Sequence, residues 1–159
     1  MPKTNLLFAG LFISKRKVKI MASTAIKAQG STIQTDIAVA GTPDTVIANL
    51  KGFSGFDGES TEVDITNLSS PAKEFDVGLQ DYGSFSMEWN PDFSDPGQND
   101  VRAAQSSGAT KTFLLTLPNG TTAQFAGLVK NASSINGGVD AALDGSVSIK
   151  ITGAVTITP

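Results

Sequence analysis

The stretch GESTEVDITNLSSPAKEFDVGLQDYGSFSMEWNPDFSDP, residues Gly58 to Pro96, carries the patterns that decide the fold of this chain. Apolar and polar residues alternate in two of its segments, Glu62–Leu68 and Ser84–Asn90. A period of two is typical of a β-strand with one buried and one exposed face. The residues expected on the buried faces are Val63, Ile65, Phe85, Met87 and Trp89.

Between these two expected strands lies a segment, Ser69–Gly83, that is too long for an ordinary hairpin connection. Hairpin loops usually have two to five residues, whereas this one has about 15, a length that indicates function or disorder in a compact domain. Its apolar content exceeds that of a disordered linker, with Pro71, Phe75, Val77, Leu79 and Tyr82. We therefore expect the loop to pack against another surface.

Strand patterns continue on both sides of this stretch. The expected strands are Thr32–Ala40, Thr45–Phe53, Thr110–Pro118, Thr121–Ala132 and Gly145–Thr158. In the first of them Ile33, Thr35, Ile37 and Val39 share one face. Asn119-Gly120 predicts a tight hairpin, Asn136–Gly138 predicts another turn, and Gly153 predicts a bulge in the last strand.

One segment has the signals of a helix. Asp95 is the expected N-cap, Pro96 the first helical residue and Gly108 the stop, with Val101 and Ala104 on the packing face. One helix among many strands has to cover an open edge or end of a sheet. The sequence thus predicts a mainly β fold: a β-sandwich or partly closed barrel of about seven antiparallel strands with one flanking α-helix.

The composition argues against an enzyme. The 159 residues include no cysteine and no histidine, which removes thiolate chemistry, the Ser-His-Asp triad and most zinc sites. The acidic loop Asp92–Asp100 lacks EF-hand spacing and is better explained as a helix start. Glu62 and Asp64 lie about 7 Å apart on one strand face, without the aromatic pocket of a glycosidase. We expect no catalytic, cofactor or metal site.

Charge is distributed unevenly along the chain. Residues 1–20 hold five of the 12 bases and no acid, which leaves 7 bases against 15 acids and a formal charge of −8 on residues 21–159. An acidic body binds nucleic acid poorly, but it can form a wall past which nucleic acid slides. Residues 1–20 are therefore treated as an extension, either an arm that reaches a neighbouring subunit or an upstream start before Met21. Residues 21–159 are expected to form a single domain.

Four motifs follow one another along the chain: an E-x-D-x-T-x-L strand, an S-x-A-K-E loop, L-x-D-x-G, and a helical D-x-x-Q…R-x-A-x-x-S-G. In this sequence they are Glu62, Asp64, Thr66, Leu68, Ser70, Ala72, Lys73, Glu74, Leu79, Asp81, Gly83, Asp95, Gln98, Arg102, Ala104, Ser107 and Gly108. Together with the closing segment GGVDAALDGSVSIKITGAVTI, they resemble the major tail tube proteins of long-tailed, lambda-like phages. Val101 stands where that family commonly has leucine. The resemblance covers roughly Ser31 to Pro159.

The resemblance implies a ring-forming fold and a structural function. It implies subunits that form hexameric rings, which stack into the tube through which DNA is ejected, with one sheet per subunit closing a barrel around the lumen. The implied location is the virion tail, assembled in the host bacterial cytoplasm. The implied partners are further copies of the chain, the tape measure, tail terminator and tail tip proteins, and DNA in non-specific passage, with no membrane and no cofactor.

Two groups of residues follow as site predictions. The expected intersubunit contact is made by Lys73, Glu74, Phe75, Val77, Leu79 and Tyr82, and the lumen-facing candidates are Asp36, Glu62, Asp64 and Glu88. Two alternatives stay open at this point. One is a tube protein of the same fold from a contractile tail or type VI secretion system. The other is a β-sandwich carbohydrate-binding module, which would need exposed Trp and Tyr in a chain that has one of each.

Overall fold

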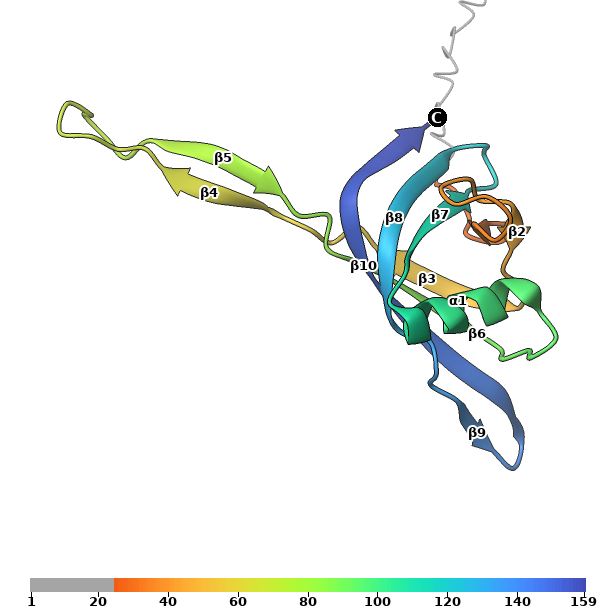
Figure 1. Ribbon diagram of the computed structural model, residues 1–159. Coiled ribbons are helices and arrows are strands. Elements are labelled where there is room, and N and C mark those ends of the chain that lie inside the picture. The colour runs from red at the N-terminus through yellow and green to blue at the C-terminus, as the bar shows by residue number, and fades with distance from the viewer. Residues whose placement is uncertain (1–24) are drawn as a thin grey trace, which may run out of the picture.

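The computed structural model describes residues 25–159 as a curled antiparallel sheet with two projecting hairpins and one helix (Figure 1). The predicted extension, residues 1–20, lies outside the described residues. The elements are β1 Thr32–Thr35, β2 Thr45–Val46, β3 Leu50–Gly55, β4 Ser60–Asp64, β5 Phe75–Gln80, β6 Ser84–Trp89, α1 Pro96–Ser107, β7 Thr110–Thr116, β8 Thr122–Asn131, β9 Asn136–Gly138 and β10 Ala141–Thr158. The mainly β prediction with one flanking helix is confirmed.

Eight strands form one sheet in the order β2-β1-β7-β8-β10-β6-β3, with β9 added beside β10. The two outer strands of this order, β2 and β3, are separated in sequence by only Ile47–Asn49, so the sheet has to curl until its two edges approach each other. The edges do not pair, and the sheet is not closed into a barrel. The expected single strand Thr45–Phe53 is thus wrong, because its two halves lie on opposite edges.

Helix α1 lies at the corner where the two edges meet. Its N-cap Asp95 accepts hydrogen bonds from the backbone nitrogens of Gln98 at 2.8 Å and Ala48 at 3.3 Å. Buried Gln98 donates to the carbonyls of Ala48 and Asn90, which belong to the two chain segments on either side of the corner. Gly97 has no room for a side chain against Val46 and Ile47. The expected caps at Asp95 and Gly108 are confirmed.

The core fills the inside of the curl. It contains the predicted inward residues Phe85, Met87 and Trp89 of β6, together with Val101 and Ala104 of α1. Phe113 of β7, Phe125 of β8 and Ile149 of β10 complete it from the other side, each at most 1% exposed. The Asn119-Gly120 turn joins β7 to β8, and β10 changes register between Thr152 and Thr156, around the predicted bulge at Gly153.

Several predictions of strand bounds and of buried faces are wrong for one reason. Alternation of apolar and polar residues does not show whether another part of the subunit covers the apolar face. Strand β1 ends at Thr35, and Ile37 and Val39 are 42% and 60% exposed in the loop that follows. Val63 and Ile65 are 47% and 51% exposed instead of buried. Asn136–Gly138 is strand β9, and the turn lies one step later at Val139–Asp140.

Candidate assembly surfaces

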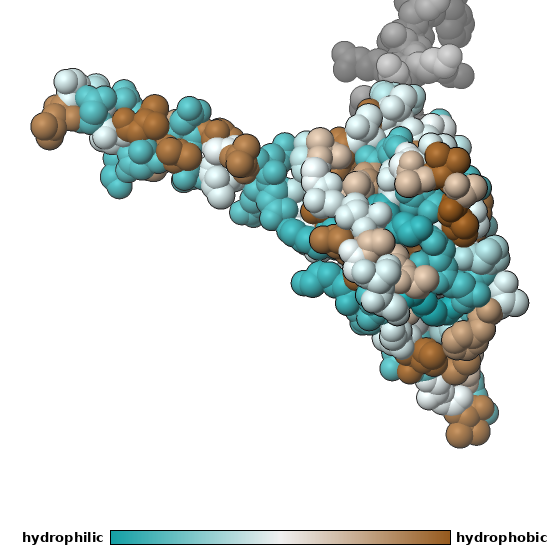
Figure 2. Space-filling model, in the orientation of Figure 1, coloured by the Kyte–Doolittle hydropathy of each residue, from teal (hydrophilic) through white to brown (hydrophobic). Residues whose placement is uncertain are grey.

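The segment expected to be a long loop is half of a projecting β-hairpin. Strand β5 occupies Phe75–Gln80 and pairs antiparallel with β4, and together they form a separate two-stranded sheet. Figure 1 shows this hairpin extending far from the body, and Figure 2 shows brown, apolar residues along it. Phe75, Val77 and Leu79 are 54%, 73% and 90% exposed. Exposed apolar surface of this extent marks an interaction site.

The strand register divides the hairpin into two unlike faces. Residues directly opposite each other in an antiparallel pair share a face, and here Glu62 lies opposite Val77 and Asp64 opposite Phe75. Strand β5 carries one extra residue beyond Val77, because Ser60 lies opposite Gln80 and the register shifts between Ser60 and Glu62. Leu79 therefore stands at a bulge and does not continue the row of Phe75 and Val77. We call Phe75 and Val77 with Glu62 and Asp64 the mixed face of the hairpin. Two residues predicted as contact thus share a surface with two predicted as lumen-facing.

The base of the hairpin is tied to the body by polar contacts. The Lys150 ammonium binds both carboxylate oxygens of Asp81 at 2.8 Å, and this hydrogen bond lowers the pKa of Asp81, with help from the backbone nitrogen of Gly83. Asp57 accepts from the backbone nitrogen of Ser84 at 2.9 Å, which is the main cause of its lowered pKa. Tyr82 is half-buried against the core. These contacts set the direction in which the hairpin leaves the sheet.

Farther out, the hairpin is held by its own hydrogen bonds. The Thr66 side chain, followed by the Thr66 backbone nitrogen, lowers the pKa of Asp64. Glu74 donates its backbone N–H to the Thr66 hydroxyl at 3.0 Å and accepts from the Ser70 hydroxyl at 2.8 Å. Glu74 and Lys73 are both exposed near the tip. The hairpin is therefore held by its own hydrogen bonds and by the contacts at its base, and its two strands form a sheet separate from the large one.

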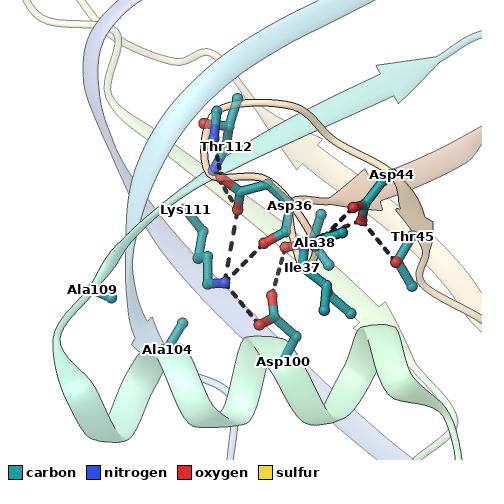
Figure 3. Close-up of polar contacts among 12 residues, drawn as sticks. Asp36, Ile37, Ala38, Asp44, Thr45, Asp100, Ala104, Ala109, Lys111 and Thr112 are labelled. Carbon is teal, nitrogen blue, oxygen red and sulfur yellow. Dashed lines mark hydrogen bonds and ion pairs between the residues drawn. The ribbon is translucent and has the colours of Figure 1, made fainter.

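Asp36 is not on an exposed face. Its side chain is 3% exposed, and it accepts hydrogen bonds from the backbone nitrogens of Thr112 at 3.2 Å and Gly41 (Figure 3). The Lys111 ammonium lies 2.8 Å from an Asp100 oxygen and 3.9 Å from an Asp36 oxygen. Asp36 thus joins the loop after β1 to α1 and β7, and it cannot line a lumen from this position.

Glu88 is the lumen candidate that lies on the sheet itself. It is exposed on the outer face of β6, opposite Ser146 of β10 and Gly52 of β3. The neighbouring row across these strands is Ser54, Ser86 and Ser148. We call the outer face of β3, β6 and Gly145–Lys150 of β10 the serine face. None of its strand residues in these ranges is an exposed large hydrophobic residue.

Lysines border the serine face, but carboxylates neutralise them. Lys51 of β3 lies 2.7 Å from Asp144 of β10, and this hydrogen bond raises the pKa of Lys51. Lys150 is paired with Asp81, as described above. The face therefore presents hydroxyls and one carboxylate without a free cation. Alternation in the sequence predicts that Ser86 and Glu88 face outward. It does not predict that the lysines are paired, because those pairs join residues that are far apart in the sequence.

A second hairpin, β9–β10, projects from the other side of the body in Figure 1. Its exposed apolar residues are Ile135, Val139 and Leu143, at 50%, 103% and 47%. The charges on it are Asp140 and Asp144. Local patterns do not predict this projection, because the glycines of Asn136–Gly138 are typical of a turn and not of a strand.

Residues 25–159 lack the features that three other classes of site require. No cluster of three or more His, Cys, Asp or Glu side chains in this part of the chain is arranged to hold a metal ion. None of the helical segments described is long and apolar enough to span a bilayer. The single tryptophan, Trp89, is 1% exposed, so it offers no platform for a sugar ring.

Comparison with known proteins gives a family and a fold. The family model described as phage tail tube, lambda-like, matches residues 24–124. The tail of an empty gene transfer agent particle, solved with C6 symmetry, matches with a TM-score of 0.67 and 18% identity, over 85% of this chain and 100% of that one. No curated protein sequence matches the chain.

Two more solved structures share the fold. The SPP1 tail tube matches with a TM-score of 0.58 and 16% identity, over 80% of this chain and 74% of that one. A sheath–tube complex of an extracellular contractile injection system matches with a TM-score of 0.60 and 10% identity, over 91% and 99%. The fold is thus shared with a phage tail tube and with the sheath–tube complex of a contractile injection system.

Proposed function

Because the chain belongs to the lambda-like phage tail tube family, we propose that it assembles into stacked hexameric rings that form the DNA conduit of the tail. As a member, it is a structural subunit of the tail tube and part of the virion. The observation that carries the assembly proposal is the β4–β5 hairpin, which pairs with no other described strand and exposes the apolar side chains of Phe75, Val77 and Leu79.

The sheet edges support assembly into rings. Among the described residues, β3 pairs only with β6, and β10 beyond Ile151 pairs only with β8, so both strands have an edge that no described strand covers. Open edges are a liability unless another chain covers them, and ring closure does this. The C6 symmetry of the gene transfer agent tail supports six copies per ring. Stacking of rings is a head-to-tail contact that does not close, and it therefore propagates.

We propose the hairpin as the main contact between subunits, through Lys73, Glu74, Phe75, Val77 and Leu79. Tyr82 contributes by packing the hairpin base against the core. The support is the exposure of the apolar row and the polar contacts that hold the base in place. A projecting apolar element on a monomer is costly in water, and its burial against another copy removes that cost.

We propose that the serine face lines the lumen, with Glu88 as its acidic residue. A wall of hydroxyls and carboxylates offers phosphates no cation to bind, so DNA passes without adhering. Glu62 and Asp64 lie on the hairpin, away from this face, and are assigned to the contact between copies. Terminator, tip and tape measure proteins are the expected partners at the ends and inside the tube.

Removal of the hairpin tests the proposal. Glu59 and Asp81 are joined by a backbone hydrogen bond of 3.1 Å, so residues 60–80 can be replaced by Asn-Gly without disturbing the sheet. We expect a soluble, folded monomer, with circular dichroism of the β type, that forms no tubes in negative-stain images. The full chain should form them under the same conditions. Tubes of normal length from the shortened chain would refute the hairpin's role, and absence of tubes from the full chain would refute the assembly proposal.

A further inference from the structure

The chemistry of the mixed face indicates which groups must lie on the surface against which the hairpin packs, called here its receiving surface. Phe75 and Val77 require apolar contact, while Glu62 and Asp64 beside them require a cation or hydrogen-bond donors. Two carboxylates buried at an interface without a counter-charge would weaken it strongly. The receiving surface therefore combines an exposed apolar residue with an unpaired positive charge.

Unpaired cations are few in the part of the chain that the structure describes. Lys51, Lys111 and Lys150 are in salt bridges, and Arg102 is hydrogen-bonded to Asn99 and Gln98. Three lysines within residues 25–159 have no recorded acidic partner: Lys27, Lys73 and Lys130. Lys73 belongs to the hairpin itself, and Lys27 precedes the first strand. Lys130 is the member of this set that lies on the sheet.

Lys130 has an apolar neighbour on the same face of β8. Leu128, two residues before it, is 40% exposed on the outer face, and half-buried Ala126 continues the row. We call Ala126, Leu128 and Lys130 the β8 stripe. Resting on the proposed assembly, we propose that the mixed face of one copy's hairpin docks on the β8 stripe of a neighbouring copy, with Glu62 and Asp64 against Lys130.

The other exposed surfaces fit less well by charge. The β9–β10 hairpin is apolar but carries Asp140, which would repel Glu62 and Asp64, while its Asp144 already pairs with Lys51. The serine face has Glu88 and no exposed large hydrophobic residue. The hairpin extends away from its own sheet in Figure 1, and β4 and β5 pair only with each other. The occupant of the β8 stripe is therefore the hairpin of a second copy of this chain.

A charge exchange tests the contact. Each of Glu62→Lys and Lys130→Glu alone places like charges together, and we expect the concentration needed for tube formation, measured by sedimentation, to rise about tenfold or more. The double variant restores opposite charges and should return to within about threefold of the unchanged chain. Lys27→Glu, at another exposed unpaired lysine, is the matched control and should leave assembly unchanged. The three changed positions, Glu62, Lys130 and Lys27, are exposed, and thermal melting checks that the variants fold.

Cross-linking locates the contact independently. The chain has no cysteine, so Val77→Cys with Leu128→Cys should give covalent chains of subunits when tubes are treated with a short bismaleimide. Val77→Cys with Val139→Cys should not. The inference is overturned if Val139 cross-links instead of Leu128, or if the double charge variant is as defective as the single ones while the unchanged chain forms tubes. If the unchanged chain forms no tubes, the proposed function fails first.

Discussion

At the scale of single residues, lysines that look alike in the sequence have very different environments. Lys111 is 19% exposed and binds Asp100 at 2.8 Å, with its ammonium also donating to the Asp36 carbonyl at 2.9 Å. Lys150 is 43% exposed and anchors the hairpin base through Asp81. Lys130 has no acidic partner among the described residues. Burial decides how much each lysine contributes to the free energy of unfolding. An ion pair exposed to solvent contributes little, whereas breaking a buried pair leaves a buried charge without its partner.

We predict that Lys111→Met lowers the free energy of unfolding by about 3 kcal/mol, since it leaves the Asp36 and Asp100 carboxylates without their cation. Lys130→Met removes the same charge from an exposed site and should change it by less than about 0.5 kcal/mol. Urea unfolding followed by fluorescence of Trp89 measures both. Equal losses in the two variants would contradict the structural role of the Lys111 cluster.

Sequence reasoning at this scale fails where the partner is far away along the chain. Asp36 continues an alternating pattern and was predicted on a solvated face, but Lys111 and Thr112, about 75 residues later, enclose its carboxylate. Gln98 likewise was placed only by a family motif, and its buried amide joins Ala48 to Asn90. No local pattern predicts such contacts, because topology and not spacing brings the residues together.

At the scale of elements, β10 serves two different sets of neighbours and has to bend between them. Its first half pairs with β6, whereas Ile149 to Thr158 pairs with β8 and shifts register after Thr152. Gly153 stands at this shift with φ +81°. A side chain at positive φ is strained, so glycine permits the bend that Figure 1 shows in β10.

We predict that Gly153→Ala lowers the free energy of unfolding by about 1–2 kcal/mol, through backbone strain alone. A Cβ there would meet no atom within 4 Å, so steric clash does not contribute. Gly52→Ala in β3 is the matched control, since it also meets nothing within 4 Å and has no positive φ. The control should be neutral or slightly stabilising. Thermal melting distinguishes the two, and equal midpoints would contradict the strain argument.

The sequence predicts well the elements whose signals lie within the element itself. It does not predict well the strands whose apolar face is not covered by the described part of the same subunit. The helix has its cap, proline and terminal glycine within the chain itself, and its bounds follow from them. From the sequence, a loop is expected where β5 lies, although Phe75, Val77 and Leu79 occupy alternate positions. Apolar alternation normally implies a buried face in the same subunit, and here that face is exposed. The alternation typical of a strand is therefore present in β5, but its apolar face is covered only if another subunit packs against it, as we propose.

At the scale of the whole molecule, the two outer regions of the curled sheet divide the tasks of contact and passage. The β8 stripe presents Leu128 and Lys130, a lysine without an acidic partner among residues 25–159. The serine face presents Ser54, Ser86, Ser148 and Glu88, with its lysines paired to carboxylates. Adhesion between subunits requires complementary charge and apolar area, whereas passage of DNA requires the absence of both. The same chain thus meets both requirements, because Lys130 lies on the β8 stripe without an acidic partner among residues 25–159, while Lys51 and Lys150 beside the serine face are paired with carboxylates.

We predict that Ser86→Lys combined with Ser148→Lys leaves tube assembly intact but slows DNA ejection. The two serines lie opposite each other on β6 and β10, so every ring would carry cations along the proposed path of the phosphates. Gln124→Lys, on exposed β8 and outside the serine face, is the control and should not affect ejection. Particles carrying each variant are triggered in vitro, and DNA release is followed with an intercalating dye. The delay should shrink as salt rises to about 0.5 M, because screening weakens phosphate contacts. Slower release from the Gln124→Lys particles alone would place the lumen on the β7–β8 side instead.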